Sequence, residues 1–256
     1  MKLAGRRVVI TRPAGQADAL RALLQADGAR VEHLPMLRID PLAADEPALQ
    51  AVKSYRQQLG DYQRVIFIST NAVLHGLRAF DLSAGQWPTA PAVYAIGRAT
   101  AQALNEAGIA AEQAAGNMNS EALLALPGLQ SVAGERILVV RGEGGRSHLA
   151  DTLRARGATV DVAETYRRHC PAYDAQDIAR CFVPLPDAAV VNSGETLKNL
   201  AVYVHGIAGI GQLPLVVPSA RVASLAQSLG FTRLVMAANA SDAAVVDALR
   251  TLNEPS

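Results

Sequence analysis

Aromatic side chains are scarce in this sequence: Phe, Trp and Tyr make up only 4% of its 256 residues, although half of the residues are hydrophobic. The cores must therefore be built from Ala, Val, Leu and Ile, which is the composition of helices packed on parallel strands. The chain is too long for one small domain and fits two domains of about 120 residues each. We therefore expect a soluble α/β protein with two hydrophobic cores.

Cysteine is nearly absent, and histidine is sparse. Cys170 and Cys181 cannot form a disulfide framework, and no paired Cys or His stands near them to complete a zinc site, so both are expected to be reduced. The histidines form no H-x-x-x-H pair, so the sequence predicts no metal site, and each histidine is expected at the surface. They are His33, His75, His148, His169 and His205.

Neither sign of charge dominates, because 24 Lys and Arg residues face 23 Asp and Glu residues, and no block of five like charges occurs. The sequence therefore lacks the electrostatic footprint of general nucleic-acid or membrane-surface binding. No run of 18 apolar residues is found, and charged residues and Pro13 interrupt the apolar stretch that an N-terminal signal peptide needs. We expect a cytoplasmic protein with neither nucleic acid nor membrane as partner.

A repeated alternation of strand and helix is what the sequence does contain. Short, almost wholly apolar runs predict strands buried on both faces of a sheet, and an amphipathic helix follows most of them. Pro127 and Gly128 are expected to close the first series of these units. The expected strands are residues 7–11, 29–34, 64–69, 93–96, 111–115, 137–140, 159–163, 188–192, 215–217 and 233–236, and the expected helices are residues 16–26, 46–59, 72–80, 99–107, 121–126, 147–156, 195–203, 222–229 and 242–252.

Two segments interrupt this alternation. In residues 157–171 (GATVDVAETYRRHCP) an apolar strand runs on into polar residues without a turn signal, and Tyr166 stands there among charged side chains. Residues 28–41 (GARVEHLPMLRIDP) have the same build, with prolines that favour an exposed extended segment. We interpret the two segments as linkers that tie the molecule together.

The two parts of the chain resemble each other. Residues 9–34 can be laid on residues 138–163 without a gap, which indicates an internal duplication. The alternative is coincidence, since any two βαβ units share apolar strands and a glycine after the helix. The coinciding positions are Arg12 on Arg141, Leu20 on Leu149 and Gly28 on Gly157, followed later by Leu74 on Leu197 and by residues 119–124 on 240–246.

Polar side chains follow the ends of the expected strands. In sheets of this kind ligands bind outside the carboxyl ends of the strands, so these donors would gather around one cleft and would suit a polyanion. The alternative for any single residue is that Ser, Thr and Asn are helix N-caps and that the arginines are solvated. The candidates are Arg12, Ser69, Asn71, Thr100, Arg141, Ser193, Ser219 and Arg221, with the turn glycines Gly97 and Gly142.

A glycine-rich turn at residues 142–147 follows a strand and opens a helix, as in dinucleotide-binding proteins. Ser147 stands where G-x-G-x-x-G needs its third glycine, which weakens a nucleotide interpretation. A nucleotide-dependent transferase therefore rests on this incomplete turn alone. Its exposed N–H groups could instead bind a carboxylate.

Six motifs in this order resemble uroporphyrinogen-III synthases over nearly the whole chain. They are TRP at 11–13, FISTNAV at 67–73, YAIGRATAQAL at 94–104, LVVRGEGGR at 138–146, ETYRR at 164–168 and VPSARVA at 217–223. The resemblance implies two doubly wound, flavodoxin-like α/β domains joined by a two-stranded antiparallel linker. The first domain would be residues 1–35 plus 171–256, the second residues 42–163, and the linker strands residues 36–41 and 164–170.

The resemblance also implies a reaction. Linear hydroxymethylbilane loses its hydroxyl as water and closes to a macrocycle with the terminal pyrrole ring inverted, through a spiro intermediate, without metal or organic cofactor. It implies that Tyr166 assists the departure of the hydroxyl, mainly by hydrogen bonding, because a phenol with a pKa of about 10 is a weak acid. The candidates above would bind the tetrapyrrole carboxylates, and a monomer is expected. The alternative function is a non-catalytic two-domain binding protein for a carboxylate-rich small molecule.

Overall fold

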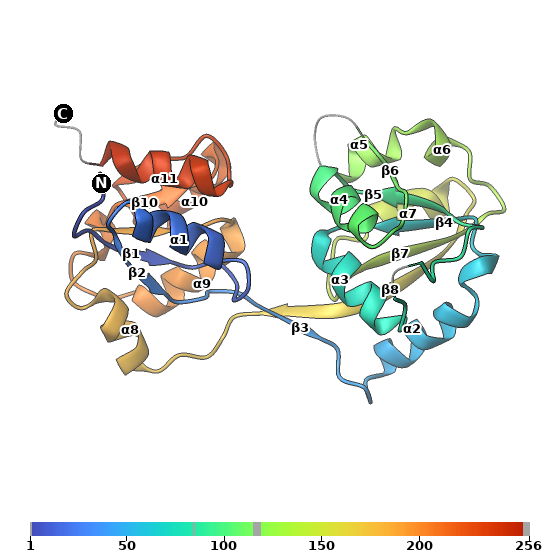
Figure 1. The fold of residues 1–256 in the computed structure, drawn as a ribbon, viewed down its shortest axis with the longest axis horizontal. Helices are drawn as coiled ribbons and strands as arrows, with labels where there is room; N and C mark the ends of the chain where they lie inside the picture. Colours follow the sequence, from blue (N-terminus) through green and yellow to red (C-terminus); the bar gives the residue numbers. More distant parts are fainter. Residues whose placement is uncertain (1, 84, 115–118, 253–256) are drawn as a thin grey trace. The chain divides into compact units, whose positions relative to one another are not determined.

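The computed structural model describes residues 2–83, 85–114 and 119–252 and divides the chain into two compact units. Unit 1 combines Met1–Ile39 with His169–Ser256, and unit 2 is Asp40–Arg168. Ala115, the last residue of an expected strand, and both ends of the expected first domain lie outside the described residues. Figure 1 traces the chain through the elements of each unit.

Unit 1 is built on a five-stranded sheet. Its strands follow the order β11-β10-β9-β1-β2, and each neighbouring pair is parallel. Parallel strands covered on both faces require apolar residues throughout, which explains why β1, β9 and β10 are almost fully buried. The strands are β1 (Arg7–Ile10), β2 (Arg30–His33), β9 (Ala188–Val190), β10 (Leu215–Val217) and β11 (Leu234–Met236).

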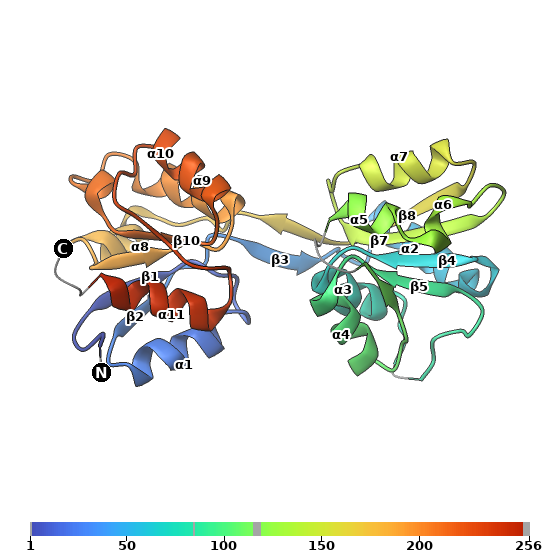
Figure 2. The ribbon, with the colours of Figure 1, turned by 90° about the horizontal axis from the view of Figure 1, so that it is seen from above.

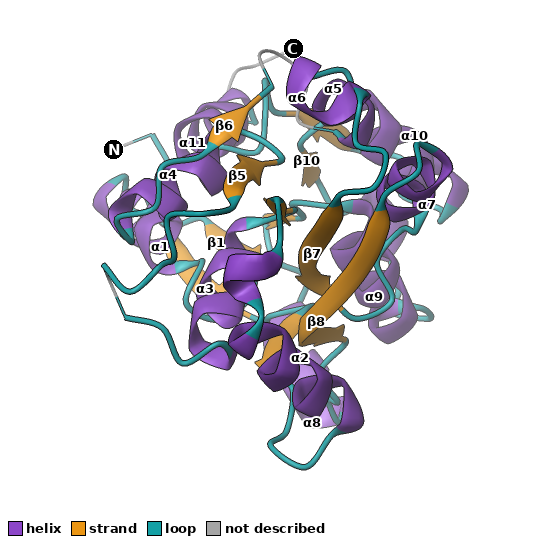
Figure 3. Ribbon diagram, turned by 90° about the vertical axis from the view of Figure 1, so that its right-hand side faces the viewer, coloured by secondary structure: helices purple, strands orange, loops and turns teal. Residues whose placement is uncertain are grey.

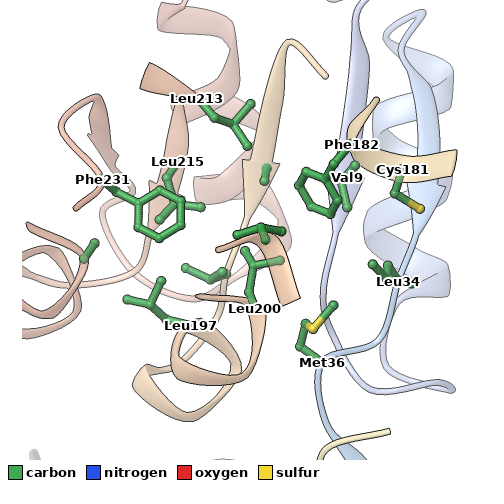
Figure 4. Packing of buried hydrophobic residues seen from close by; sticks show 14 of the residues in the cluster. Val9, Leu34, Met36, Cys181, Phe182, Leu197, Leu200, Leu213, Leu215 and Phe231 are labelled. Atoms are coloured by element: carbon green, nitrogen blue, oxygen red, sulfur yellow. The ribbon is translucent and has the colours of Figure 1, made fainter. Parts of the chain in front are cut away.

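Helices cover both faces of this sheet, with α1 and α11 on one side and α9 and α10 on the other (Figure 2). Alternate strand residues therefore enter different cores: Val8 and Ile10 face α1 and α11, whereas Val9 faces the opposite cluster. Helix α8 also packs into this second cluster, where its Phe182 lies near Leu34 and Met36 (Figure 4). The elements are α1 (Asp18–Ala26), α8 (Ala175–Phe182), α9 (Gly194–Val204), η2 (Ile210–Gln212), α10 (Ala220–Ser228) and α11 (Asp242–Thr251).

Unit 2 is built on a six-stranded sheet in the order β3-β8-β7-β4-β5-β6. The pairs from β8 to β6 are all parallel, and Figure 3 shows β7 and β8 side by side. Without β3, the order β8-β7-β4-β5-β6 matches the order of unit 1 read from β2 to β11. In this match β8 corresponds to β2, and β7 corresponds to β1. The strands are β3 (Arg38–Pro41), β4 (Arg64–Phe67), β5 (Ala92–Ala95), β6 (Glu112–Gln113), β7 (Arg136–Gly142) and β8 (Thr159–His169).

Helices α5, α6 and α7 lie on one face of this sheet, and α3 and α4 lie on the other (Figure 2). The first face shares a core that includes Ile66, Val139 and Leu149, and the second buries Phe67 and Val140. The helix α2 packs against α3. The elements are α2 (Pro47–Gln57), η1 (Leu59–Asp61), α3 (Thr70–Ala79), α4 (Arg98–Glu106), α5 (Ser120–Leu124), α6 (Pro127–Gln130) and α7 (His148–Ala155).

The predicted mixed α/β fold with parallel sheets is confirmed, and several details differ from the sequence-based expectation. Pro127 begins the helix α6 instead of closing a series, because proline at the first helical position has no N–H that needs a partner. Helix α8 lies outside the expected elements, although Asp174 caps it through the Asp177 N–H. Strand β8 continues to His169, so Glu164 and Tyr166 pair with β7 inside the sheet of unit 2.

Candidate functional site

Tyr166 lies at the carboxyl end of the sheet of unit 2. It pairs with Gly142 after an irregularity between Arg141 and Gly142, where the register of β7 and β8 shifts. Such a shift re-aims the side chains that follow it. The Tyr166 side chain is buried, with 4% of its surface exposed, and its hydroxyl lies 3.0 Å from Ser69 Oγ. A phenol hydroxyl is therefore held at the edge where ligands of parallel sheets bind.

Ser69 is positioned by the helix that it caps. It follows the buried strand β4 with extended backbone, and its Oγ accepts a hydrogen bond from the Ala72 N–H at 2.9 Å. Serine is favoured at this position because its oxygen satisfies a backbone donor that has no partner within the helix. The same oxygen meets the hydroxyl of Tyr166. Ser69 thus combines its expected capping role with a contact to the candidate catalytic tyrosine.

Gly142 makes room for the Tyr166 ring. A Cβ atom at Gly142 would lie 2.5 Å from Cε2 and 2.6 Å from Cζ of Tyr166. Any larger residue would therefore displace the ring or the strand. The backbone N–H of Glu143 donates to the Tyr166 carbonyl oxygen at 2.8 Å, which fixes β8 beside this turn.

His75 is the side chain that the sequence analysis missed at this site. It was expected at the surface, but it lies on α3 with 7% of its surface exposed, so this expectation was wrong. Its ring centroid is 5.3 Å from that of Tyr166, and the ring planes are inclined by 32°. Burial lowers the pKa of His75 from its ordinary value, with a further contribution from Arg78, while Asp40 acts in the opposite direction.

Two of the three candidate arginines, Arg12 and Arg141, are neither solvated nor free. Arg141 donates to Glu164 Oε1 at 2.9 Å and to the Arg146 carbonyl oxygen at 3.1 Å. Arg12 donates to Asp242 and to the carbonyl oxygen of Ala240. Only 14% of the Arg141 side chain and 12% of the Arg12 side chain are exposed. Each guanidinium therefore already compensates a carboxylate within its own unit.

A hollow of about 520 Å³ opens at the carboxyl edge of unit 2. Ile68 and Ile96, which follow β4 and β5, line its apolar part, and Arg141, Arg146 and Arg168 supply positive charge. Glu121 and His148 also line it. An apolar floor with several guanidinium groups suits a ligand that is part ring system and part carboxylate.

The remaining candidates divide between the two units. In unit 2, Thr100 is buried in α4, Gly97 is the N-cap of that helix, and Asn71 is half-buried in α3. In unit 1, Ser193 and Ser219 cap α9 and α10 by accepting from Thr196 and Val222 N–H groups. Arg221 is exposed and forms no ion pair with any described residue. The capping expectation is therefore confirmed for Ser69, Ser193 and Ser219.

Comparison with known proteins decides the family. The family model described as uroporphyrinogen-III synthase HemD matches residues 18–247. The chain belongs to the uroporphyrinogen-III synthase family. This confirms the family that the six motifs predicted.

Relatives and solved structures agree with the assignment to the uroporphyrinogen-III synthases. The chain is 35% identical to the enzyme of Salmonella typhimurium and 33% identical to that of Escherichia coli, each over 95% of this chain and 99% of the relative. A mutant uroporphyrinogen III synthase of Thermus thermophilus has the same fold, with a TM-score of 0.64 at 15% identity over 97% of this chain and 98% of that one. The Helicobacter pylori enzyme gives 0.61 at 13% identity over 96% and 99%.

No group of three or more His, Cys, Asp or Glu side chains in residues 2–83, 85–114 and 119–252 is arranged to hold a metal ion. Over the same ranges, no helix combines the length and the apolar character that a membrane crossing requires.

Proposed function

We propose that this chain cyclises hydroxymethylbilane to uroporphyrinogen III in haem biosynthesis, with loss of water and inversion of the terminal pyrrole ring. The family match over residues 18–247 carries this conclusion, together with identities of 33–35% to curated uroporphyrinogen-III synthases. The chain is accordingly a cyclising lyase. A non-catalytic binding protein for a carboxylate-rich molecule is not favoured, because this chain matches two curated enzymes over 99% of the length of each.

Tyr166 is the residue proposed to assist departure of the hydroxyl group. In this step the carbon–oxygen bond breaks, and the oxygen keeps the electron pair, takes up a proton and leaves as water. The positive charge left on the methylene carbon spreads over the pyrrole nitrogen, and the proton is returned when the ring closes. A phenol that donates a hydrogen bond to the leaving oxygen lowers the cost of this separation. The contact between Tyr166 and Ser69 supports the role, since it holds the hydroxyl at the carboxyl edge of the sheet.

Ring closure then needs geometry more than acid or base strength. The substituted α-carbon of the terminal pyrrole attacks the cationic methylene carbon, and the new carbon–carbon bond gives the spiro intermediate. The bond from this carbon to its original bridging methylene then breaks, and that methylene, now cationic, bonds to the unsubstituted α-carbon of the same ring. This carbon loses a proton, so that the ring is inverted and the overall change is the release of one water. Fixing the two ends of a flexible chain near each other removes an entropic barrier. Inversion of the last ring requires that the protein hold one particular arrangement of those ends.

The substrate carboxylates are proposed to meet the donors at the carboxyl edges of the sheets. Helix N-termini supply backbone N–H groups there without a large net positive charge. Arg12 already pairs with Asp242, and Arg141 already pairs with Glu164. Each guanidinium group would therefore have to bind the substrate carboxylate and its own acidic partner at the same time. The proposed set is Arg12, Ser69, Asn71, Gly97, Thr100, Arg141, Gly142, Ser193, Ser219 and Arg221.

We also propose that the two units arose by duplication. Residues that are paired in the sequence alignment lie in similar environments. Gly28 and Gly157 both have a positive φ after a helix, and Arg12 and Arg141 both pair with a carboxylate. The matching strand orders add support. The pairing of Leu74 with Leu197 needs a shift of one position along the sequence, because Leu74 is 58% exposed whereas Leu197 is buried. Setting the N-caps Ser69 and Ser193 together instead matches Val73 with Leu197, which are both buried.

The expected division into domains with antiparallel linker strands belongs to this proposal. It is supported by the compact units Met1–Ile39 with His169–Ser256 and Asp40–Arg168, and by the neighbouring positions of β3 and β8 in one sheet. A monomer and a cytoplasmic location stay predictions. Light scattering of the purified protein measures the first, and fractionation of cells measures the second.

Product analysis tests the function directly. Purified protein is mixed with freshly prepared hydroxymethylbilane, and the uroporphyrin isomers are separated after oxidation. We expect type III to dominate, because only enzymatic closure inverts the terminal ring. A product that contains only the type I isomer of spontaneous closure would contradict the proposed function.

A further inference from the structure

His75 is a buried titratable group that the proposed mechanism leaves without a task. It stands on α3, in the helix that Ser69 caps, and its ring lies against that of Tyr166 at 5.3 Å between centroids. Its Nδ1 atom is buried and has no hydrogen-bond partner among the described residues. A buried polar atom without a hydrogen-bond partner lowers stability, and an apolar side chain would fill the same space without that cost. Packing alone therefore does not explain a histidine at this position.

The surroundings of His75 favour its neutral form. Protonation would turn the unpartnered Nδ1 into a buried cationic N–H donor without an acceptor, which is costly. Arg78, on the same helix, adds repulsion, whereas Asp40 on β3 acts in the opposite direction. From β8 the neighbouring group is the phenol of Tyr166.

We propose that His75 is a positioning residue that holds the Tyr166 phenol at Ser69 and does so only in its neutral form. Three groups then define the place of the phenol: the Gly142 backbone, the Ser69 hydroxyl and the His75 ring. The inference rests on the proposed function, since it concerns the same tyrosine.

A neutral ring also suits the chemistry at this position. The reaction generates a cationic methylene carbon, and an imidazolium next to Tyr166 would repel that cation within a poorly hydrated region. The pKa of His75 is lowered from its ordinary value of about 6.5, so the ring is neutral above that pH and gains its charge as the pH falls below it. Activity should therefore fall on the acid side together with this protonation.

Two variants separate positioning from packing. His75→Phe keeps a ring but cannot titrate, and His75→Ala removes the ring. The rate of type III formation is measured between pH 5 and pH 8, with spontaneous type I product counted separately. We expect His75→Phe to stay within about threefold of the native kcat at pH 8 and to lose the acid decline below pH 6.5. We expect His75→Ala to lower kcat by about tenfold or more with little change in KM.

Controls keep the outcomes distinct. His205→Phe changes an exposed histidine of unit 1 and should leave the pH profile unchanged. If His75→Phe does not fold, the profile is measured on His75→Gln, which also cannot gain charge in this range. Retention of the native kcat and acid decline in the folded variants would overturn the proposal and make His75 a core residue. Absence of type III product from the native protein would instead contradict the proposed function.

Discussion

Gly142 and Tyr166 lie on neighbouring strands so close together that no side chain fits between them. A Cβ atom at Gly142 would approach two ring carbons of Tyr166 to 2.5 and 2.6 Å. We expect Gly142→Ala to displace the ring and lower kcat by about tenfold or more, because small displacements of a positioned group are costly. We also expect a loss of about 1–3 kcal/mol in the free energy of unfolding, as overpacking usually produces. Rates of type III formation and urea titrations measure the two effects.

Gly60→Ala is the matched control for this substitution. Gly60 lies in unit 2 with no atom within 4 Å of an added Cβ. Its kcat should stay at the native value. Equal activity losses in Gly60→Ala and Gly142→Ala would show that displacement of Tyr166 is not the cause.

Removal of the Tyr166 hydroxyl tests its proposed role. Tyr166→Phe should fold normally and lose about 10- to 100-fold in the rate of type III formation, as expected for one lost donor. Tyr62→Phe is the control, because the Tyr62 hydroxyl is also hydrogen-bonded, to Asp161 at 2.7 Å, but belongs to a different part of unit 2. That variant should lose stability and keep its rate. A native rate in Tyr166→Phe would reduce Tyr166 to a packing residue.

Ser69 caps α3 and also contacts the hydroxyl of Tyr166, so its substitution should have two effects. Ser69→Ala removes an N-cap, which costs about 0.5–2 kcal/mol in the free energy of unfolding, and removes the partner of the Tyr166 hydroxyl. Ser241→Ala removes only a cap, that of α11. Both variants should lose stability in thermal unfolding, but only Ser69→Ala should lose activity at temperatures where both stay folded. Full activity in Ser69→Ala would contradict a role of the contact between Ser69 and Tyr166 in the reaction.

Asp27 should contribute to stability in a defined pH window. A hydrogen bond from Arg250, at 2.8 Å, and one from the Lys2 N–H hold the pKa of Asp27 below its ordinary value of about 3.8. A carboxyl group with a lowered folded pKa stabilises the fold above its unfolded pKa, and this contribution is lost as the pH falls through the folded value. Native protein should therefore lose stability below about pH 4 more steeply than Asp27→Asn. Melting temperatures along a pH series measure this.

Asp18→Asn is the reference for the acid series. The Asp18 side chain is 79% exposed, so its removal should leave the acid slope close to the native one. Parallel slopes for native protein and Asp27→Asn would contradict the contribution of Asp27.

The sequence alone indicates much of this site because several of its signals are local. Apolar runs predict buried strands, and a serine after such a run predicts a helix cap, as Ser69, Ser193 and Ser219 show. Tyr166 stands out because a strand continues past its expected end without a turn. Each of these signals depends on a few adjacent residues, whose backbone preferences act over the same short distance.

Other features have no local signal. Arg12 finds Asp242 at a separation of 230 residues, and no pattern near either residue predicts the pair. The sequence around His75 is that of an exposed helical histidine. Its ring is enclosed with Tyr166 because α3 packs on β7, the neighbour of β8 in the sheet. Even Glu164, close to the candidate tyrosine in sequence, becomes the partner of Arg141 only through the register of β7 and β8.

The sequence by itself determined the alternation of strands and helices, the family and the tyrosine to examine. Tertiary structure decided which charges are paired, which histidine is buried and how the Tyr166 hydroxyl is held. The physical reason is the range of the interactions. Backbone preferences and caps act within one turn or strand, whereas strand order and register bring together side chains that are far apart along the chain.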